Sequence, residues 1–164
     1  MSMLRLLAGP DLMSGPEPLA EHGRRLGPLP PHVDNLIETL VRSGLSGRGG
    51  ASFPVGLKWR SIACRSRRSA VVVVNGAEGE PHSRKDRLLM SVRPHLVIDG
   101  AFLAARTLKA RQIIFYIGEE HVAARTAMVR ALAARPETEA LSARWYPACP
   151  QTRRGTLPGA GRPA

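Results

Sequence analysis

Apolar side chains recur at a helical spacing in the first patterned segment of the chain. Five positions fall at i, i+3, i+4, i+7 and i+8, namely Val33, Leu36, Ile37, Leu40 and Val41. This spacing places them on one face of a helix. Gly44 follows the stripe, and a glycine after the last periodic residue is a common stop signal. The pattern therefore predicts an amphipathic helix that ends at Gly44.

Two continuous apolar runs predict strands. Residues 70–74 read AVVVV and end at Asn75 and Gly76, while residues 112–117 read QIIFYI and end at Gly118. Short β-branched runs without polar alternation are typical of strands buried on both faces of a parallel sheet. We therefore expect both runs to lie in the interior of such a sheet.

Helical segments accompany the two predicted strands. Residues 95–109 contain few charges and have the apolar content of a buried crossover helix, which parallel strands require between them. A second helix is predicted from Val122 through Leu132 toward Pro136, with Glu119 and Glu120 in its first turn. The predicted fold class is α/β, with a parallel sheet and a right-handed βαβ crossover.

Proline and glycine divide the chain into three zones. Residues 1–31 contain six prolines and four glycines, so we expect an extended lead-in that wraps the body without forming a packed layer. Residues 32–142 carry the periodic segments and form the predicted domain. Residues 143–164 are rich in proline, arginine and glycine, and they predict a disordered tail because so few apolar groups offset the entropy of ordering.

Positive charge restricts the classes of partner. The 164 residues carry a formal net charge of +11, which favours phosphate-bearing partners such as nucleotides, nucleic acid or anionic lipid. The basic stretches lack the interleaved aromatic residues on which bases stack. A basic nucleic-acid-binding protein therefore remains only an alternative supported by charge.

Targeting segments and metal ligands are sparse in the sequence. No apolar run approaches the roughly 20 residues needed to cross a bilayer, and the first residues lack a signal-peptide core, so we expect a cytoplasmic protein without membrane insertion.

Cys64 and Cys149 are the two cysteines, whereas an iron–sulfur cluster normally takes four thiolates. No histidine lies three or four residues from another, and we expect no metal site.

A glycine-rich loop is the first candidate for ligand binding. Residues 47–59 read GRGGASFPVGLKW. They match neither the P-loop, whose lysine directly follows a glycine, nor the dinucleotide fingerprint, which follows a strand. Three glycines in four residues still let a backbone approach a flat or charged ligand, and Pro54 can start a helix whose N-terminus faces an anion. The loop indicates either ligand binding or a surface turn.

A second candidate follows the valine run. Residues 75–81 read NGAEGEP, and they come at the carboxyl end of a predicted parallel strand, where ligands gather in α/β sheets. Asn75 can bond a polar ring edge, and Glu78 and Glu80 can accept from hydroxyl groups. An acidic, solvated turn is the alternative. We expect this turn and the glycine loop to lie side by side and to form one shelf for flat aromatic rings.

The motifs resemble a known family. GLSGRGGASFPVGLKW at 44–59, VVNGAEGEP at 73–81, KDR at 85–87 and PHL at 94–96 occur in that order. They closely resemble the NADH-binding FMN flavoprotein subunit of bacterial NADH:quinone oxidoreductase, respiratory complex I, and related subunits of NAD-reducing hydrogenases and formate dehydrogenases. The resemblance covers roughly residues 36–135 and implies the N-terminal part of an FMN-binding α/β domain.

The resemblance implies roles for individual residues. NADH would pass a hydride to FMN, and electrons would then leave through an iron–sulfur cluster. By matching positions, the FMN-binding residues would be Gly47, Arg48, Gly49, Lys58, Asn75 and Glu78. The NAD-binding residues would be Gly50, Ala51, Phe53, Gly56 and Glu80, with Phe53 stacking on NADH. No side chain would act as an acid or base, because the reaction needs only the two rings held in contact.

Departures from the family pattern bear on the expected function. Ala77 stands where the family commonly has aspartate, and Ser52 where it often has glycine. The family continues beyond this length with a further FMN-contacting segment and a cysteine-rich cluster domain. We expect the NADH- and FMN-binding part of an NADH dehydrogenase flavoprotein, with the other subunits of such a complex as partners. A non-catalytic nucleotide-binding or assembly module and an inactive fragment are the alternatives.

Overall fold

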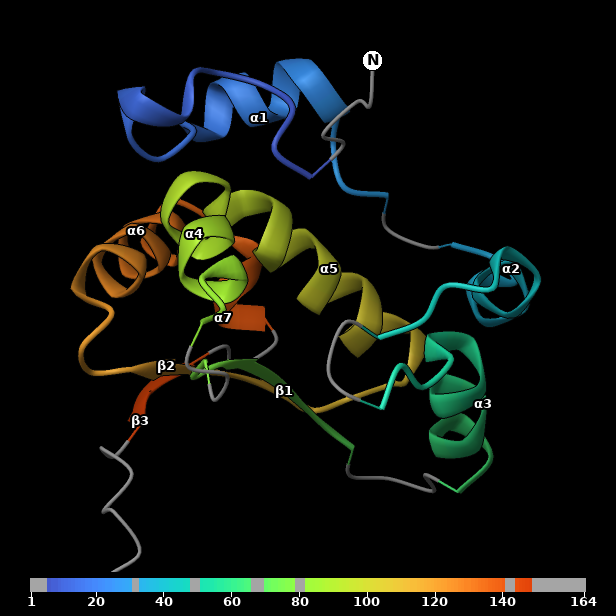
Figure 1. The fold of residues 1–164 in the computed structure, drawn as a ribbon. Coiled ribbons are helices and arrows are strands. Elements are labelled where there is room, and N and C mark those ends of the chain that lie inside the picture. The colour runs from blue at the N-terminus through green and yellow to red at the C-terminus, as the bar shows by residue number, and fades with distance from the viewer. Residues whose placement is uncertain are drawn as a thin grey trace, which may run out of the picture.

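The computed structural model describes residues 6–30, 33–47, 51–65, 70–78, 82–140 and 144–148. Figure 1 shows the path of the chain through helices and strands. In chain order the elements are η1 (Leu12–Ser14), α1 (Leu19–Leu26), α2 (Leu36–Ser43), α3 (Val55–Arg65), β1 (Val71–Gly76), α4 (Lys85–Val92), α5 (Pro94–Thr107), β2 (Gln112–Gly118), α6 (Val122–Ala133), α7 (Glu137–Ala140) and β3 (Arg144–Ala148).

The described strands form one parallel sheet in the order β1-β2-β3. Val71 pairs with Gln112 and Gly76 with Ile117, so β1 and β2 run in register over the whole of β1. The connection from β1 to β2 passes through α4 and α5, of which only α5 was expected from the sequence. The predicted α/β class and the parallel βαβ unit are confirmed.

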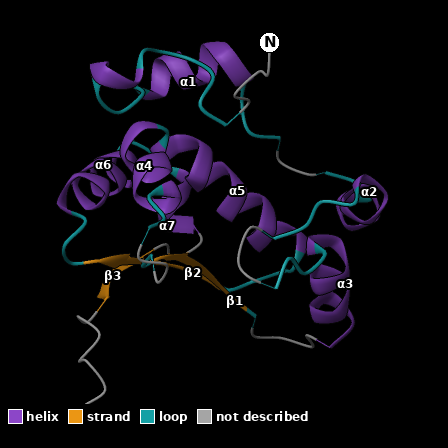
Figure 2. Ribbon diagram, in the orientation of Figure 1, coloured by secondary structure: helices purple, strands orange, loops and turns teal. Residues whose placement is uncertain are grey.

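The hydrophobic core lies between the sheet and the helices on one of its faces. Figure 2 shows α4, α5 and α6 above the strands. The fully buried apolar side chains come from α5, β2 and α6, and include Ile98, Phe102, Ile113, Phe115, Ile117 and Met128. Burying a large apolar side chain contributes roughly 1.5–3 kcal/mol, so these contacts are the main attachment of the helices to the sheet.

The expectation that the valine strand is buried on both faces is wrong. Val71 is 37% exposed and Val73 is 58% exposed, while Val72 and Val74 are half-buried and pack against the core. Alternate residues of a strand point to opposite faces of the sheet. The continuous apolar run therefore contributes one set of valines to the core and leaves the other set uncovered.

The predicted helices occur close to their expected positions. α2 begins at Leu36 and is followed by Gly44 at φ 63°, where the backbone is left-handed, a conformation that glycine adopts without steric cost. α5 and α6 cover the two other predicted helical segments. Glu119 and Glu120 form a turn before α6 and do not lie in its first turn, so their expected interaction with that helix is not formed.

The N-terminal segment differs from the expected extended lead-in. It contains η1 and α1, and α1 lies against α5 (Figure 1). The guanidinium group of Arg93 is fully buried and donates hydrogen bonds to the carbonyl oxygens of Leu7, Ala8 and Pro10. The backbone N–H of Glu17 donates to the carbonyl oxygen of Val92 at 3.0 Å. These backbone contacts attach the segment to the junction of α4 and α5.

Buried charges join the N-terminal segment to the helices. Arg25 donates two hydrogen bonds to the Glu17 carboxylate, at 2.8 and 2.9 Å. His22 lies 2.7 Å from Asp99, and the guanidinium group of Arg135 lies 2.6 Å from the same carboxylate. Burial raises the pKa of Glu17, but Arg25 and the other nearby cations outweigh it and hold this pKa below 4.5. Glu17 is therefore ionised inside the protein at neutral pH.

The expected disordered tail is wrong for its first residues. β3 covers Arg144–Ala148 and pairs in parallel with β2 from Ile114 to Gly118. Residues 149–164 lie outside the described part of the chain. Partners in the neighbouring strand order this short segment, because a strand gains its hydrogen bonds from another strand and not from its own composition.

Within the described residues, no single helix is long and apolar enough to cross a membrane. α4 and α5 meet the length and composition requirement only as a pair, and the two helices are bent by 102° at their junction. The buried apolar side chains of α5 belong to the same core as those of the sheet and α6.

Candidate functional site

The carboxyl end of β1 carries two of the predicted flavin-binding residues. Asn75 lies on the exposed face of the strand, and its side-chain oxygen accepts a hydrogen bond from the backbone N–H of Ala77 at 3.0 Å. This arrangement is an Asx turn, which directs the chain away from the sheet. The amide NH2 group of Asn75 has no hydrogen-bond partner among the described residues. It is a donor at the edge where α/β proteins bind ligands.

Glu78 stands next to this turn and is held in place by the start of α4. Its side chain is 3% exposed, and one of its oxygens lies 3.9 Å from Nε of Arg87. The other oxygen accepts hydrogen bonds from the Ser83 hydroxyl and from the backbone N–H of Asp86. A carboxylate that accepts from a first-turn N–H stabilises the N-terminus of a helix. Glu78 therefore has a structural role in anchoring α4.

The same contacts keep Glu78 ionised. Burial raises the pKa of its carboxyl group, but the hydrogen bonds from Ser83 and from the backbone of Asp86 and Arg87 outweigh this effect and leave the pKa below 4.5. Oε2 is buried and has no hydrogen-bond donor in the described part of the chain. An ionised oxygen without a donor can accept from a ring N–H or a hydroxyl of a ligand.

The glycine-rich loop is closed at its base by backbone hydrogen bonds. Ser46 and Pro54 form an isolated antiparallel bridge. The N–H of Gly47 donates to the carbonyl oxygen of Phe53 at 2.9 Å, and the N–H of Val55 donates to that of Leu45 at 2.8 Å. Three predicted site residues inside the loop, Arg48, Gly49 and Gly50, lie outside the described residues. The two described arms of the loop are thus held together at the start of α3.

The C-terminal arm of the loop presents two predicted NAD-binding residues to solvent. Phe53 is 56% exposed, and Ala51 is also exposed. Ser52 between them has φ 44°, a left-handed conformation that costs a residue with a side chain more than glycine. This backbone explains why glycine suits the position, and it shows that the loop keeps its shape with serine.

Gly56 and Lys58 lie on α3, which begins at Val55 directly after Pro54 as the sequence predicts. Gly56 is buried, and a Cβ atom built on it would lie 2.5 Å from the backbone nitrogen of Val41. This glycine therefore lets α3 approach α2 closely, and packing accounts for its lack of a side chain. Lys58 is exposed. The roles predicted for these two residues in binding NAD and FMN remain predictions.

Replacing Gly56 by alanine should lower the free energy of unfolding by about 1–3 kcal/mol, because the new methyl group would overlap the backbone of α2. Gly100→Ala is a matched control, since Gly100 lies inside α5 with no atom within 4 Å of the added methyl group. That substitution should stabilise the protein by about 0.5–1 kcal/mol. Urea denaturation measures both values, and equal effects of the two substitutions would contradict the packing role of Gly56.

The described parts of the two candidate segments lie apart. Figure 1 shows the turn after β1 beside α4, whereas the described arms of the glycine loop lie beside α2 and α3, beyond the end at which β1 begins. The described arms of the loop are thus apart from the Asn75 turn in this view. The single shelf remains a prediction, because Arg48, Gly49 and Gly50 at the tip of the loop lie outside the described residues. Glu80, the remaining predicted residue, lies outside the described residues.

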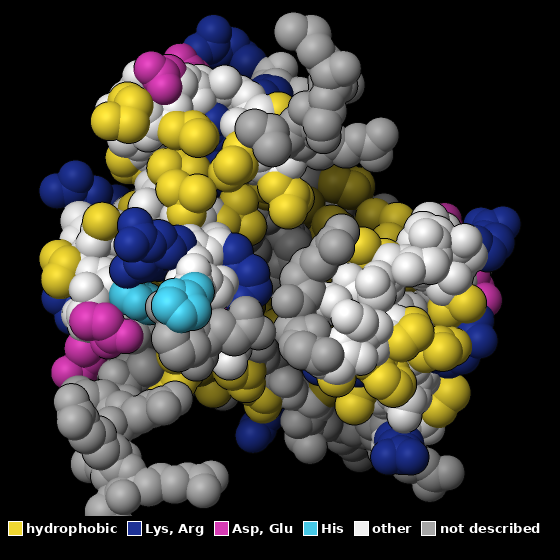
Figure 3. All heavy atoms as spheres, viewed as in Figure 1, with side chains coloured by type: hydrophobic (Ala, Val, Ile, Leu, Met, Phe, Trp, Pro, Cys, Tyr) yellow, Lys and Arg dark blue, Asp and Glu magenta, His cyan; other side chains and the backbone are white. Residues whose placement is uncertain are grey.

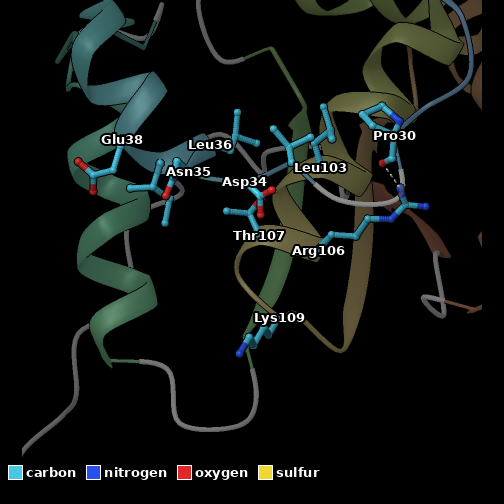
Figure 4. Close-up of a pocket in the computed structure, with 11 residues that line it drawn as sticks. Pro30, Asp34, Asn35, Leu36, Glu38, Leu103, Arg106, Thr107 and Lys109 are labelled. Atoms are coloured by element: carbon cyan, nitrogen blue, oxygen red, sulfur yellow. Dashed lines mark hydrogen bonds between the residues drawn. The ribbon is translucent and has the colours of Figure 1, made fainter.

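A cavity of about 310 Å³ separates α2 from the C-terminal end of α5. Figure 4 shows Leu36 and Asn35 on one side of it and Leu103, Arg106 and Thr107 on the other. None of the predicted flavin- or NAD-binding residues lines this cavity. Its walls carry both acidic and basic side chains, so charge alone does not select a ligand.

The α2–α3 region also exposes apolar side chains. Leu45, Phe53, Leu57 and Ile62 are each at least 40% exposed, and Figure 3 shows hydrophobic atoms on the visible surface of this region. Cys64, the free cysteine of the described residues, is exposed near the end of α3. No group of three or more His, Cys, Asp or Glu residues within the described ranges is arranged to hold a metal ion.

Several residues that shape the site and its support were not found from the sequence. Ser83 and the backbone of Asp86 orient Glu78, and this pairing is local enough to suggest a turn but not its geometry. His22 and Asp99 are 77 residues apart and pair at 2.7 Å. A single sequence carries no signal for such a contact, because only the packing of α1 on α5 brings the two side chains together.

Sequence comparison places most of this chain within one family profile. The profile of the Nuo51 FMN-binding domain matches residues 40–152. An NADH-quinone oxidoreductase subunit of Rhodobacter capsulatus is 42% identical over 100 residues, which are 60% of this chain and 23% of that protein. Its counterpart in Rhizobium meliloti is 37% identical over 100 residues, 61% of this chain and 24% of that protein. The chain thus spans about a quarter of the length of these relatives.

Solved structures with a similar fold include two of the NAD+-reducing NiFe hydrogenase. A chain of the H2-reduced form has a TM-score of 0.53 and 31% sequence identity, and the match covers 68% of this chain and 20% of that chain. The air-oxidised form gives a TM-score of 0.57 at 28% identity with the same coverage. Both the sequence and the fold are therefore similar to parts of much longer chains.

Proposed function

Because this chain belongs to the family of the Nuo51 FMN-binding domain, we propose that it is the FMN- and NADH-binding part of an NADH dehydrogenase flavoprotein. The proposal is specific about the location of the flavin. It assigns the polar edge of the flavin ring to the turn from Asn75 to Glu78, at the carboxyl end of β1.

The observation that carries the proposal is a pair of polar groups at this turn that make no hydrogen bond within the described residues, the Asn75 amide NH2 and Oε2 of Glu78, which lies 3.9 Å from Nε of Arg87. The Asn75 amide can donate to an acceptor on the flavin edge, and the ionised Oε2 of Glu78 can accept from a ring N–H or a ribityl hydroxyl. Parallel α/β sheets bind ligands outside the carboxyl ends of their strands. The edge of a flavin ring alternates hydrogen-bond acceptors with an N–H donor. The Asn75 donor and the Glu78 acceptor are therefore complementary to this edge.

The cations of the glycine loop are assigned to the phosphate of FMN. Lys58 on α3 is exposed, and an ammonium group binds phosphate as a point charge. The described arms of the loop lie toward the end at which β1 begins (Figure 1), so the proposal places the phosphate of FMN on the α3 side and the ring at the Asn75 turn.

Phe53 and Ala51 are assigned to NADH. The ring of Phe53 is 56% exposed, so one of its faces is available for stacking on a flat base or nicotinamide. Bound FMN would supply a two-electron acceptor that releases electrons one at a time. The residues of this chain would hold the nicotinamide and flavin rings in contact, and no proton transfer by a side chain is required.

The electron acceptor and the other partners are assigned to other polypeptides or segments. The oxidoreductase relatives are subunits of larger enzymes by their names. Two cysteines cannot supply the four thiolates of a cuboidal cluster. We therefore assign the iron–sulfur cluster to a part of the complex that this chain does not contain, and the complex to the cytoplasmic side of the membrane.

A flavin titration tests the proposal. The purified chain should quench FMN fluorescence with one-to-one saturation, and anaerobic NADH should then bleach the flavin absorbance. Asn75→Ala and Lys58→Gln should each raise the Kd about tenfold or more, which corresponds to about 1.4 kcal/mol. Lys109→Gln removes the same charge from the loop after α5, and it should leave the Kd unchanged.

Three results would overturn parts of the proposal. A lack of saturation up to about 1 mM FMN would exclude flavin binding and leave the assembly module or inactive fragment. Sensitivity to Lys58→Gln without sensitivity to Asn75→Ala would exclude the turn as the flavin-binding element. Binding to DNA with a steep salt dependence and no competition by NADH would favour a nucleic-acid-binding protein.

A further inference from the structure

The N-terminal segment, residues 6–30, is attached to the rest of the protein mainly through titratable side chains. Two of its residues are buried, and these are Glu17 and His22. Leu29 packs on the edge of the core and is partly buried. The large apolar side chains that the segment exposes are Leu6, Met13, Leu19 and Leu26. Figure 1 shows α1 beyond α4 and α5, on the side away from the sheet. Apolar burial is therefore a minor part of this attachment.

A seam of mostly buried charged and titratable side chains joins the segment to the helices. Its members are Glu17, His22, Arg25, Arg93, His95, Asp99 and Arg135. With neutral histidines, three guanidinium groups face two carboxylates in the seam, and the carboxylate of Glu137 lies 3.7 Å from Nε of Arg135. These charges balance. A proton on either histidine would therefore add an uncompensated positive charge to a buried site, which is unfavourable.

Several polar atoms of the seam have no hydrogen-bond partner among the described residues. They are Nδ1 of His22, Nδ1 of His95, Oδ1 of Asp99, and Nε and Nη1 of Arg135. The ion pair between Asp99 and Arg135 is nevertheless close, at 2.6 Å. Buried polar atoms without a partner lower stability, and water would reach these atoms if the segment moved away. Contacts of this kind are typical of the less stable parts of a structure, which open locally.

We propose that residues 6–30 form a strap that opens as one unit while the sheet and the helices α4, α5 and α6 remain folded, and that acid favours the open form. The strap ends at Pro30, whose carbonyl oxygen accepts a hydrogen bond from Arg106 at 2.8 Å, outside the seam. Opening breaks the contacts of the seam and leaves the β1–β2 pairing intact. It exposes His95, Asp99 and Arg135 to water. This inference goes beyond the proposed function and does not depend on flavin.

The effect of acid comes from His95, whose ring centroid lies 5.6 Å from that of His22. Burial, with repulsion from Arg135 and His22, lowers the pKa of His95 from 6.5 to about 4, against the opposing effect of Asp99 and Glu17. In the open form water reaches the imidazole, and its pKa returns toward 6.5. The open form then binds a proton that the closed form excludes. The opening constant should therefore rise about thirtyfold between pH 7.5 and pH 5.

Native-state amide exchange of the full chain in low concentrations of urea, followed by NMR, tests the strap. Each measured rate is divided by the rate of an unstructured peptide at the same pH. The N–H of Glu17, which bonds Val92, and the N–H of Gly27 at the end of α1 should share one opening free energy and one dependence on urea. Both quantities should be smaller than those of Phe115 in β2, because strap opening exposes less surface than global unfolding.

Substitutions separate the acid effect from the attachment. His95→Gln should remove most of the rise in the opening constant at low pH, whereas His82→Gln should keep it, because His82 is exposed. Asp99→Asn removes the carboxylate that faces His22 and Arg135, and it should raise the opening constant at pH 7.5 by at least about tenfold. Glu21→Gln is the matched control, since Glu21 pairs with Arg24 on the surface of α1, and it should change the constant less than about threefold.

Three results would overturn the proposal. If the strap and β2 share one opening free energy, the strap opens only when the whole protein unfolds. If each strap amide has its own free energy and almost no dependence on urea, the segment frays and does not move as a unit. If the opening constant stays the same between pH 7.5 and pH 5, or rises equally in His95→Gln, acid does not act through the seam.

Discussion

Replacing Arg93 by alanine should lower the free energy of unfolding by about 3–5 kcal/mol, the usual loss when one partner of a buried charge network is removed. The Arg93 side chain is fully buried and lies 4.0 Å from the Glu17 carboxylate. Its guanidinium group also satisfies the carbonyl oxygens of Leu7, Ala8 and Pro10. The substitution would leave these acceptors without their donor and the buried Glu17 carboxylate without one of its nearby cations. Urea denaturation measures the loss, and limited proteolysis should show faster cleavage within residues 6–30.

Two further substitutions separate the geometry of Arg93 from its charge. Arg93→Lys keeps the charge, but one ammonium group cannot reach carbonyl oxygens in several directions, so it should recover only part of the stability. Arg24→Ala removes an arginine whose side chain is 76% exposed beside Glu21, and it should change the stability by no more than about 0.5 kcal/mol. If Arg93→Ala were as mild as Arg24→Ala, the N-terminal segment would not depend on this contact.

Acidification should destabilise the protein through His95. Burial, with repulsion from Arg135 and His22, lowers the pKa of His95 from 6.5 to about 4, although Asp99 and Glu17 oppose the shift. Between these two pH values the unfolded chain binds a proton that the folded protein excludes, so stability falls as the pH falls. The expected loss between pH 7.5 and pH 5 is about 2 kcal/mol, rising to about 3 kcal/mol at pH 4.

His95→Gln removes this titration and should make the free energy of unfolding much less dependent on pH between 6.5 and 4. His82→Gln is the control because His82 is exposed, and it should keep the dependence of the native protein. Glu17 acts in a separate window, since its lowered pKa supports stability above about pH 4.5 that is lost at more acidic pH. A native protein with the same stability at pH 7 and pH 5 would contradict the burial of neutral His95.

Much of the fold was predictable from local patterns. The stripe from Val33 to Val41, the two β-branched runs and the apolar segment between them each predicted an element that the structure contains. Periodicity succeeds for the helices because one face of a helix repeats its packing contacts every 3.6 residues. The pattern failed for α1 and β3, because α1 is held against α5 by the contact between His22 and Asp99 and β3 by pairing with β2, which are contacts between residues distant in the sequence.

The candidate site was predictable in its parts but not in its assembly. The motifs identified Asn75, Glu78 and the glycine loop, and the family profile covers all of them. The orientation of Glu78 by Ser83 and the role of Gly56 in bringing α3 against α2 needed coordinates. Neither packing contacts nor hydrogen bonds between segments follow from the types of residues in a motif.

The amino-acid sequence alone determined the class of fold, the parallel strands and the family, because hydrophobic period and motif order are properties of the chain itself. Tertiary structure alone decided that Val71 and Val73 face away from the helices, that the described arms of the glycine loop lie apart from the Asn75 turn, and that Arg93 binds the N-terminal segment. The physical reason is the same in each case. These features depend on which surfaces pack together, and a continuous apolar run or a buried arginine is compatible with several packing arrangements, of which the folded protein forms one.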